Sequence, residues 1–272
     1  MLILTLNEES NLRRCLDSLS WCDDVVVLDS NSADRTVHIA NEYGVRFIER
    51  PFDDYANQRN YGLNDIQYKN PWVLMVDADE EVSPDLASEI KLVLDHVKPE
   101  ICLYRMRRKD YFFNKWIRHS SGYPTWFGRL ARVGHVRVER AINEEYHTDG
   151  EIAYLEHHLL HYPFNKGFHA WFEKHNRYST MEAAASSSRE VNAVTFGDLV
   201  QSDPVERRKA IKSFVYSLPG RPILMFFALY FIRRGFLDGS PGLTYCMLRA
   251  IYEYMIDCKV KEMKLRRKGL PL

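Results

Sequence analysis

One apolar run, WVLMVDADEE from Trp72 to Glu81, constrains the fold of this chain more than any other stretch. It is apolar as far as Val76 and then stops at carboxylates. Such a run predicts a buried strand of a parallel sheet, and open α/β sheets bind their ligands beyond the carboxyl ends of such strands. Asp77 and Asp79 therefore mark a candidate site. The alternative is that these acids only lead into the helix that Ser83-Pro84 begins.

The spacing of Asp77 and Asp79 is suited to binding a metal ion. Two carboxylates one residue apart at a strand end can bind the same hard cation, because Mg²⁺ and Mn²⁺ prefer oxygen ligands and share their remaining positions with phosphate. No G-x-G-x-x-G or G-x-x-x-x-G-K-[ST] motif follows the first strand, so the glycine-rich phosphate loop of dinucleotide-binding and P-loop proteins is absent. The sequence predicts that Mg²⁺ or Mn²⁺ on Asp77 and Asp79 holds a nucleotide diphosphate.

The residues before this run predict three more strands, each followed by a helix. Strands are expected over residues 2–6, 25–28 and 46–49, and helices over 10–19, 35–43 and 55–63. This alternation predicts an α/β fold with a mostly parallel central sheet flanked by helices. Two of these strands end in polar residues, Asn7-Glu8 and Asp29, so we expect those side chains to converge with Asp77 and Asp79 at one sheet edge.

Four motifs in this region resemble a known family. They are TLNEE at residues 5–9, W-x-D-x-VVVLDS-x-S-x-D-x-T at 21–36, QRN-x-GL at 58–63 and DADE at 77–80. In order and spacing they resemble glycosyltransferase family 2, and they cover most of residues 1–110. The resemblance implies the Rossmann-like GT-A fold.

The resemblance also implies roles for individual residues. Asp77, Ala78 and Asp79 would belong to the metal and the donor diphosphate. Arg59 would lie near the nucleoside, although it could instead be a surface arginine paired with Asp53 or Asp54. The remaining donor-binding residues would line a pocket for a uridine-type nucleoside: Thr5, Asn7, Glu8 and Asp29.

Residues 121–132, SGYPTWFGRLAR, resemble the acceptor-side stretch of a branch that includes lipopolysaccharide-core and capsule glucosyltransferases. We assign Arg129 of this stretch to the donor site. The branch continues into a Val-His-Glu element, where this chain has Asn143 in place of the histidine and then Glu144. Inverting transfer needs a carboxylate that takes the proton of the acceptor hydroxyl. Glu144 is the predicted base, Glu145 and Asp149 are the alternatives, and an acidic surface turn is the competing interpretation.

Two further clusters follow. His157, His158 and His161 have no cysteine partners and no H-E-x-x-H helix, so a zinc site is weakly supported and we expect His161 near the diphosphate instead. Arg107-Arg108-Lys109 predicts a solvated basic patch.

The last third of the chain differs in kind. Residues 164–185 have helical spacing with one aromatic face, which is typical of a core helix. Pro222 to Ile232 is an apolar run of 11 residues between Arg221 and Arg233-Arg234. A membrane span needs about 20 residues. The run therefore predicts an in-plane membrane segment with the arginines at the headgroups, or else a buried core helix; a subunit interface is the third possibility.

Charge and cysteine content suggest where the protein works. Residues 1–100 contain 20 acidic and 9 basic side chains, and the rest of the chain contains 17 and 28. A basic second half fits an anionic membrane surface, and no nucleic-acid partner is expected. Five cysteines without a C-x-x-C pair, and no signal-peptide pattern, predict a reducing, cytoplasmic location, peripheral on the inner face of the cytoplasmic membrane.

The combined prediction has two domains. Residues 1–163 form a GT-A nucleotide-sugar-binding and catalytic domain, and residues 164–272 form an amphipathic helical extension that contacts a membrane or a second subunit. The predicted activity is inverting, metal-dependent transfer of a hexose such as glucose from a UDP-sugar to a saccharide or lipid-linked saccharide, in bacterial lipopolysaccharide or polysaccharide synthesis. A sugar-phosphate nucleotidyltransferase and a non-catalytic, membrane-docked nucleotide-sugar-binding module are the alternatives.

Overall fold

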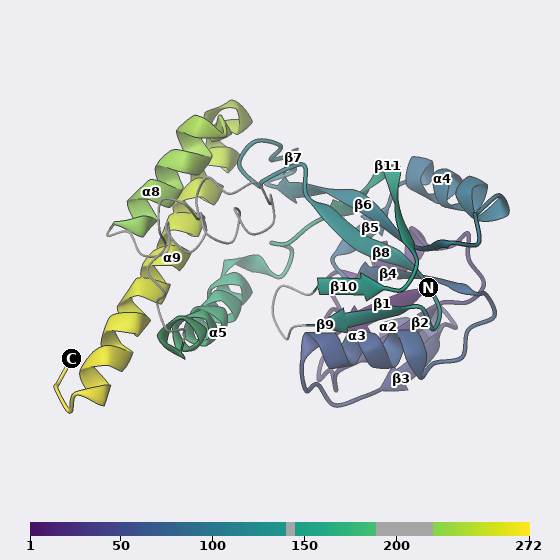
Figure 1. Cartoon of the computed structure of the whole chain (residues 1–272), viewed down its shortest axis with the longest axis horizontal. Coiled ribbons are helices and arrows are strands. Elements are labelled where there is room, and N and C mark those ends of the chain that lie inside the picture. The colour runs from purple at the N-terminus through teal and green to yellow at the C-terminus, as the bar shows by residue number, and fades with distance from the viewer. Residues whose placement is uncertain (140–144, 189–219) are drawn as a thin grey trace. The chain divides into compact units, whose positions relative to one another are not determined.

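The computed structural model describes residues 1–139, 145–188 and 220–272, with the side chains of 185–188 left out. The chain forms two compact units, drawn in Figure 1. Unit 1 comprises Met1–Trp116 and Tyr123–Lys166, and unit 2 comprises Ile117–Gly122 and Gly167–Leu272. The assignment of catalysis to residues 1–163 and of membrane or subunit contact to residues 164–272 stays a prediction.

Unit 1 begins with the predicted alternation of strands and helices, and every strand and helix expected before residue 85 is present. Its elements are β1 (Leu2–Thr5), α1 (Leu12–Asp17), β2 (Val26–Asp29), α2 (Thr36–Glu42), β3 (Arg46–Glu49), α3 (Tyr55–Asn64), β4 (Trp72–Asp77), β5 (Glu80–Val82), α4 (Pro84–Asp95), β6 (Ile101–Phe112), β7 (Lys115–Trp116), β8 (Trp126–Arg132), β9 (Val136–Glu139), β10 (Glu145–Thr148) and β11 (Glu151–His161).

The sheet of unit 1 has the strand order β3-β2-β1-β4-β8-β6-β11-β5, with β7 paired to β6. Strands β3, β2, β1, β4, β6 and β11 run in one direction, and β8, β5 and β7 run in the other. β9 and β10 form a separate antiparallel ribbon, visible beside the sheet in Figure 1. The predicted α/β class, with a mostly parallel central sheet, is confirmed.

The core of unit 1 has two layers because successive strand residues point to opposite faces of the sheet. Ile3 and Val27 share one cluster with buried residues of α1, α2 and α4. Leu2 and Val26 share the other with residues of α3 and the β9–β10 ribbon. Gly62 lets α3 approach the sheet closely, since a Cβ at this position would overlap the side chain of Leu2.

Two strands are followed by residues in a left-handed backbone conformation. Asn7 follows β1 with φ 54° and Asn31 follows β2 with φ 62°, in the left-handed region that asparagine tolerates better than most residues. The helix start after β4 is also as predicted, because the Ser83 hydroxyl accepts a hydrogen bond from the Leu86 amide and Pro84 is the first helical residue. The two interpretations of this stretch are therefore compatible: the acids lie at a strand end, and a capped helix follows.

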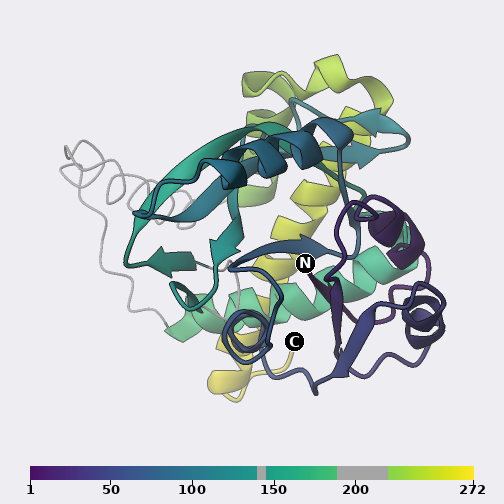
Figure 2. The ribbon, with the colours of Figure 1, turned by 90° about the vertical axis from the view of Figure 1, so that its right-hand side faces the viewer.

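Unit 2 is helical over most of its described residues from Gly167 onward (Figure 2). A buried aspartate joins its separate segments, because Asp238 Oδ2 accepts hydrogen bonds from the amides of His119 and Ser120 at 2.9 and 2.8 Å. The predicted helix over 164–185 is confirmed, with Trp171 buried and its ring stacked on His175. The elements are α5 (Gly167–Ser188), α8 (Arg221–Phe227), the π-helical turn η1 (Ala228–Ile232), the 3₁₀ turn η2 (Gly235–Asp238) and α9 (Gly239–Arg267).

The apolar run at 222–232 is not a buried core helix, so that interpretation is wrong. Ile223 is 65% exposed and Ile232 is 80% exposed, and Phe227 and Phe231 are about half exposed. Arg221 corrects a second expectation: it is buried and pairs with Glu253 on α9 at 2.8 Å, so it is not available to a lipid headgroup. None of the described helices combines the length and the apolar character needed to cross a membrane.

Candidate active site

Asp77 is held by two arginines at the end of β4. Its Oδ1 accepts a hydrogen bond from Arg59 Nη2 at 2.8 Å, and its Oδ2 accepts one from Arg129 Nη2 at 2.5 Å. Arg59 comes from α3 and Arg129 from β8, and both side chains are buried. Burial alone would raise the pKa of Asp77, but the two guanidinium groups hold it well below its usual range. The carboxylate is therefore ionised throughout the physiological pH range.

The alternative interpretation of Arg59, a surface arginine paired with Asp53 or Asp54, is wrong. Asp53 pairs with Arg50 at 2.8 Å, and Asp54 accepts from the amide of Asn57 as the N-cap of α3. Arg59 is instead turned inward from α3 to Asp77.

Glu80 completes this part of the site and was not predicted as a functional residue. Its carboxylate is fully buried and lies 3.0 Å from Arg129 and 3.4 Å from Arg108. Its second oxygen accepts from the Asp77 amide at 3.0 Å. Glu80 therefore fixes both the backbone at Asp77 and the guanidinium that binds Asp77.

Asp79 belongs to a second chain of contacts. His161 Nε2 lies 3.3 Å from Asp79 Oδ2, and His161 Nδ1 lies 2.6 Å from Asp110 Oδ1. Arg108 Nε donates to the same Asp110 oxygen at 3.0 Å. Burial and the nearby Arg108 lower the pKa of His161, but Asp79 and Asp110 outweigh them and raise it to about 9. The expected solvated patch at 107–109 is thus wrong for Arg108, which is a partly buried member of the site.

Asp77 and Asp79 both offer carboxylate oxygens at the end of β4. Asp77 accepts three hydrogen bonds from the two arginines, whereas a carboxylate offers about four lone-pair positions. The side chains of Asp77 and Asp79 are similarly exposed, at 29% and 24%, and Asp79 forms an ion pair with His161. Ala78, between them, is buried. Hard oxygen donors at a strand end fit Mg²⁺ or Mn²⁺.

The expected nucleoside residues lie at the ends of β1 and β2. Thr5 Oγ1 donates to Asp29 Oδ1 at 2.6 Å, and the Ser32 amide donates to Asp29 Oδ2 at 2.7 Å. Both Thr5 and Asp29 are buried, so in this structure they shape the strand ends. Asn7 is exposed and accepts from the Ala33 amide. Direct contact of Thr5 or Asp29 with a nucleoside stays a prediction.

Glu8 has a partner that the sequence did not suggest. Lys166 Nζ lies 2.5 Å from Glu8 Oε1 and also donates to the Leu6 carbonyl at 2.9 Å. Burial raises the pKa of Glu8, and the ammonium of Lys166 opposes this rise. A lysine therefore lies beside the strand-end loop that follows β1.

The structure describes two of the three candidate bases, Glu145 and Asp149. Glu144, the predicted base, lies outside the described residues. Glu145 is exposed at the start of β10 and pairs across the ribbon with Glu139. Asp149 lies in the turn before β11, near His135, whereas His161 at the other end of β11 is the residue that contacts Asp79. Asp149 is therefore poorly placed to act as the base.

The sequence also missed Asp110, although a signal for it was present. Asp110 and His161 lie near the carboxyl ends of two parallel strands, β6 and β11, and they are direct partners in the register. The pairing of these strands joins residues 51 positions apart, and alternation within one segment does not reveal it.

Comparisons with known proteins place the chain in a family. The model of the family described as "Glycosyl transferase family 2" matches residues 1–158, more than half of the chain. One relative is a lipopolysaccharide core biosynthesis glycosyltransferase, LpsC, of Rhizobium meliloti, 27% identical over 95% of this chain and 90% of its own length. Another is an uncharacterised glycosyltransferase of Rickettsia typhi, 27% identical over 98% of this chain and 88% of its own length.

Among solved structures, the chain is similar to a mannosyltransferase of Pyrobaculum calidifontis in complex with GDP-Man and Mn²⁺. It is 17% identical, with a TM-score of 0.49 over 95% of this chain and 85% of the other. TarS of S. aureus in complex with UDP-GlcNAc is 14% identical, with a TM-score of 0.44 over 99% of this chain and 91% of the other. On the family match over residues 1–158, the chain belongs to glycosyl transferase family 2 and is a glycosyltransferase.

Proposed function

We propose that this glycosyltransferase moves a hexose such as glucose from a UDP-sugar to a saccharide or lipid-linked saccharide of the bacterial cell surface, with inversion and with the help of Mg²⁺ or Mn²⁺. The observation that carries the proposal is the ordered carboxylate pair at the end of β4. Asp77 is fixed by Arg59 and Arg129, and Asp79 lies beside His161. The similarity to LpsC supports an acceptor in lipopolysaccharide core synthesis.

The residues around Asp79 are suited to the departure of a nucleoside diphosphate. When bound, the metal would neutralise negative charge that develops on the leaving diphosphate. Asp79 would hold the metal, and Asp77 would keep the two arginines and the strand end in position. His161, with its pKa raised to about 9, is a positively charged group next to Asp79 at neutral pH. Fixed charges of this kind stabilise a transition state because they need no reorganisation during the reaction.

Arg129 acts in this proposal through Asp77 and Glu80. Its side chain is 4% exposed and is engaged with both carboxylates. We therefore treat it as a positioning residue. Thr5 and Asp29 shape the nucleoside side in the same indirect way, and Asn7 and Glu8 are closer to the surface.

Glu144 is the proposed general base. The proposal rests on the resemblance of residues 121–145 to the acceptor-side stretch of the family branch. A carboxylate that accepts the acceptor's proton contributes about 10²- to 10⁴-fold to the rate. Glu145 is the remaining alternative, because Asp149 lies at the other end of the ribbon.

The helical unit supplies a surface that fits an anionic membrane. Leu243, Met247, Ile251 and Tyr254 recur at helical spacing on α9, and all four are more than one third exposed. α8 and η1 of the same unit also have exposed apolar residues, Ile223 and Ile232 among them. The last part of α9 is basic, with Lys261, Lys264, Arg266 and Arg267, whereas Lys259 donates to Asn176 and Thr180 of α5. Apolar area with clustered basic side chains favours the cytoplasmic leaflet, where each basic group contributes about 1 kcal/mol.

The activity can be tested by incubating the full chain with a panel of nucleotide sugars, Mn²⁺ and saccharide or lipid-linked acceptors. The proposal expects acceptor-dependent release of a nucleoside diphosphate. Release of pyrophosphate from a nucleoside triphosphate and a sugar phosphate would indicate a nucleotidyltransferase instead. Saturable binding of a nucleotide sugar without turnover on any acceptor would indicate a binding module.

A further inference from the structure

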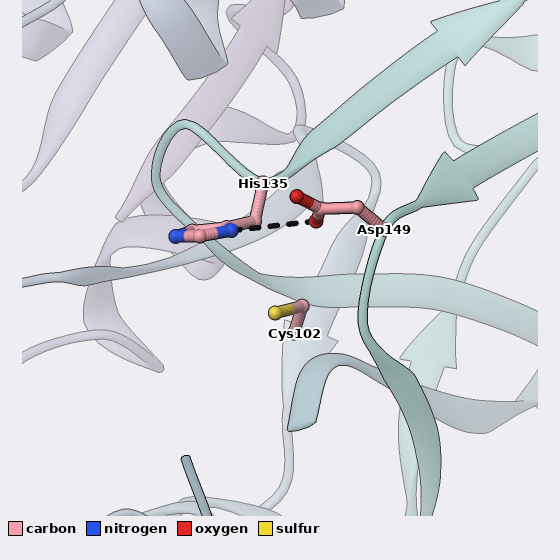
Figure 3. A group of neighbouring side chains, drawn as sticks. All are labelled: Cys102, His135 and Asp149. Atoms are coloured by element: carbon pink, nitrogen blue, oxygen red, sulfur yellow. Dashed lines mark hydrogen bonds and ion pairs between the residues drawn. The ribbon is translucent and has the colours of Figure 1, made fainter. Parts of the chain in front are cut away.

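Three side chains far from the D-x-D pair come together at the opposite edge of the sheet (Figure 3). Cys102 is the second residue of β6, His135 lies in the turn between β8 and β9, and Asp149 lies in the turn between β10 and β11. One ligand atom from each lies within 4.8 Å of the other two. One strand and two separate turns contribute these residues, so the cluster is a product of the fold and not of sequence spacing.

The two exposed members already have the separation of two ligands on one ion. His135 Nδ1 lies 3.3 Å from Asp149 Oδ1. This is longer than the 2.7–2.9 Å typical of a hydrogen bond between charged groups. Two N or O ligands of a tetrahedral Zn²⁺ site, each about 2.0–2.1 Å from the ion, lie about 3.3 Å apart. The distance between His135 Nδ1 and Asp149 Oδ1 matches this separation.

The third member is buried beneath this pair. Cys102 is 4% exposed, and the chain passes over its sulfur at Gly150. A Cβ at residue 150 would overlap the sulfur, so only glycine lets the turn that carries Asp149 pass so close. The Glu151 amide donates to the Glu100 carbonyl at 2.7 Å and holds this turn against the start of β6. An open pocket of about 490 Å³ gives access to the three side chains from solvent.

We propose that Cys102, His135 and Asp149 form a binding site for a thiophilic divalent cation, with Zn²⁺ as the expected ion. A thiolate, an imidazole and a carboxylate are zinc ligands, whereas Mg²⁺ and Mn²⁺ prefer oxygen donors alone. Three protein ligands leave the fourth position to a water molecule. The site is distinct from the D-x-D pair: Asp110, which pairs with His161 beside Asp79, lies eight positions beyond Cys102 on β6, about 26 Å at a rise of about 3.3 Å per residue.

The position of the site suggests a structural role. His135 immediately precedes β9 and Asp149 immediately follows β10, and the register pairs Val136 with Thr148 at this end of the ribbon. An ion bound to these ligands would link this end of the β9–β10 ribbon to β6. Residues 140–144, which join the two strands in the sequence, include Glu144. Metal binding should therefore slow amide hydrogen exchange in the ribbon strands.

Cobalt binding to the full chain tests this proposal. After removal of metal with a chelator, titration with Co²⁺ should give a near-ultraviolet thiolate-to-cobalt charge-transfer band that saturates at one equivalent and disappears when Zn²⁺ is added. Cys102→Ser should abolish the band. His135→Gln and Asp149→Asn should each weaken binding by more than about 10-fold, since the loss of an outer-shell partner alone costs about 10- to 100-fold.

Two control variants separate this site from others. Cys258→Ser removes an exposed thiol outside the cluster, and Asp79→Asn alters the D-x-D pair; both should keep the band. If Cys102→Ser proves unstable, the other two variants still decide, because His135 and Asp149 are exposed and their replacement leaves the core unchanged. The proposal fails if the wild type shows no thiolate band, if Cys258→Ser loses it, or if neither His135→Gln nor Asp149→Asn changes the affinity.

Discussion

Replacement of Arg129 by methionine should strongly destabilise unit 1. Arg129 is the common partner of Asp77 and Glu80, at 2.5 and 3.0 Å, and Glu80 is fully buried. Methionine fills a similar volume but leaves these carboxylates with fewer positive partners. Breaking a buried ion pair by removing one partner costs about 3–5 kcal/mol. At about 2–4 °C per kcal/mol for a unit of this size, the melting temperature should fall by about 6–20 °C.

The assay is urea unfolding of wild type and variant, followed by far-ultraviolet circular dichroism, with Arg137→Met as the matched control. Arg137 is also on a strand of unit 1 and pairs with Glu139 at 2.9 Å, but its side chain is 70% exposed, so its loss should cost less than about 1 kcal/mol. Adding Asp77→Asn to Arg129→Met should recover part of the loss, with a coupling energy of about 0.5–3 kcal/mol. Equal effects of the two arginine variants, or strictly additive effects in the double variant, would refute this account of the site.

Three other predictions concern the base, the membrane and pH. Glu144→Gln should lower kcat by about two to four orders of magnitude while donor binding persists, and a comparable loss in Glu145→Gln alone would move the base to that residue. The double variant Met247→Ser, Ile251→Ser should sediment less with anionic liposomes at low salt. The control Leu92→Ser, which changes an exposed leucine of α4, should sediment as wild type does. The membrane proposal is wrong if wild type does not bind such liposomes, or if it dimerises through the exposed apolar residues of α9. Burial lowers the pKa of His175 to about 4, against 6.5 when unfolded, so the folded state disfavours its charged form. Its contribution to stability is present above about pH 6.5 and is lost as the pH falls toward 4, so His175→Gln should lose less unfolding free energy than wild type between pH 7.5 and 5 in urea titrations.

The elements of unit 1 up to α4, apart from β5, could be predicted because the relevant signals are local. The run at 72–77, the N-cap at Ser83 and the strands at 2–5 and 26–29 depend on neighbouring residues alone. Polar side chains at the ends of parallel strands converge by topology, so the strand pattern alone is enough to place Asp77, Asp79 and Asp29 at one edge of the sheet.

The partners of these carboxylates could not be predicted in the same way. Arg108 is one of three consecutive basic residues, a pattern typical of a solvated surface, yet its place on β6 turns it toward Glu80 and Asp110. Lys166 reaches Glu8 from a distant part of the sequence, beyond the last strand of the sheet. The apolar run at 222–232 was ambiguous because composition does not tell whether a helix is covered by protein, and only the fold shows that Ile223 and Ile232 are exposed.

The central claim is that a divalent metal on Asp79 holds the diphosphate of the donor. The most direct measurement is calorimetric binding of the nucleoside diphosphate, UDP in the first instance, to the full chain with Mn²⁺ and with EDTA. Wild type should bind UDP more than about 10-fold more tightly with Mn²⁺, and Asp79→Asn should lose this difference, since removing a ligand should cost at least as much as removing an outer-shell partner. The control Asp23→Asn, an exposed aspartate paired with Lys69, should behave as wild type. Equally tight binding in EDTA, or an unchanged response to Mn²⁺ in Asp79→Asn, would contradict the claim.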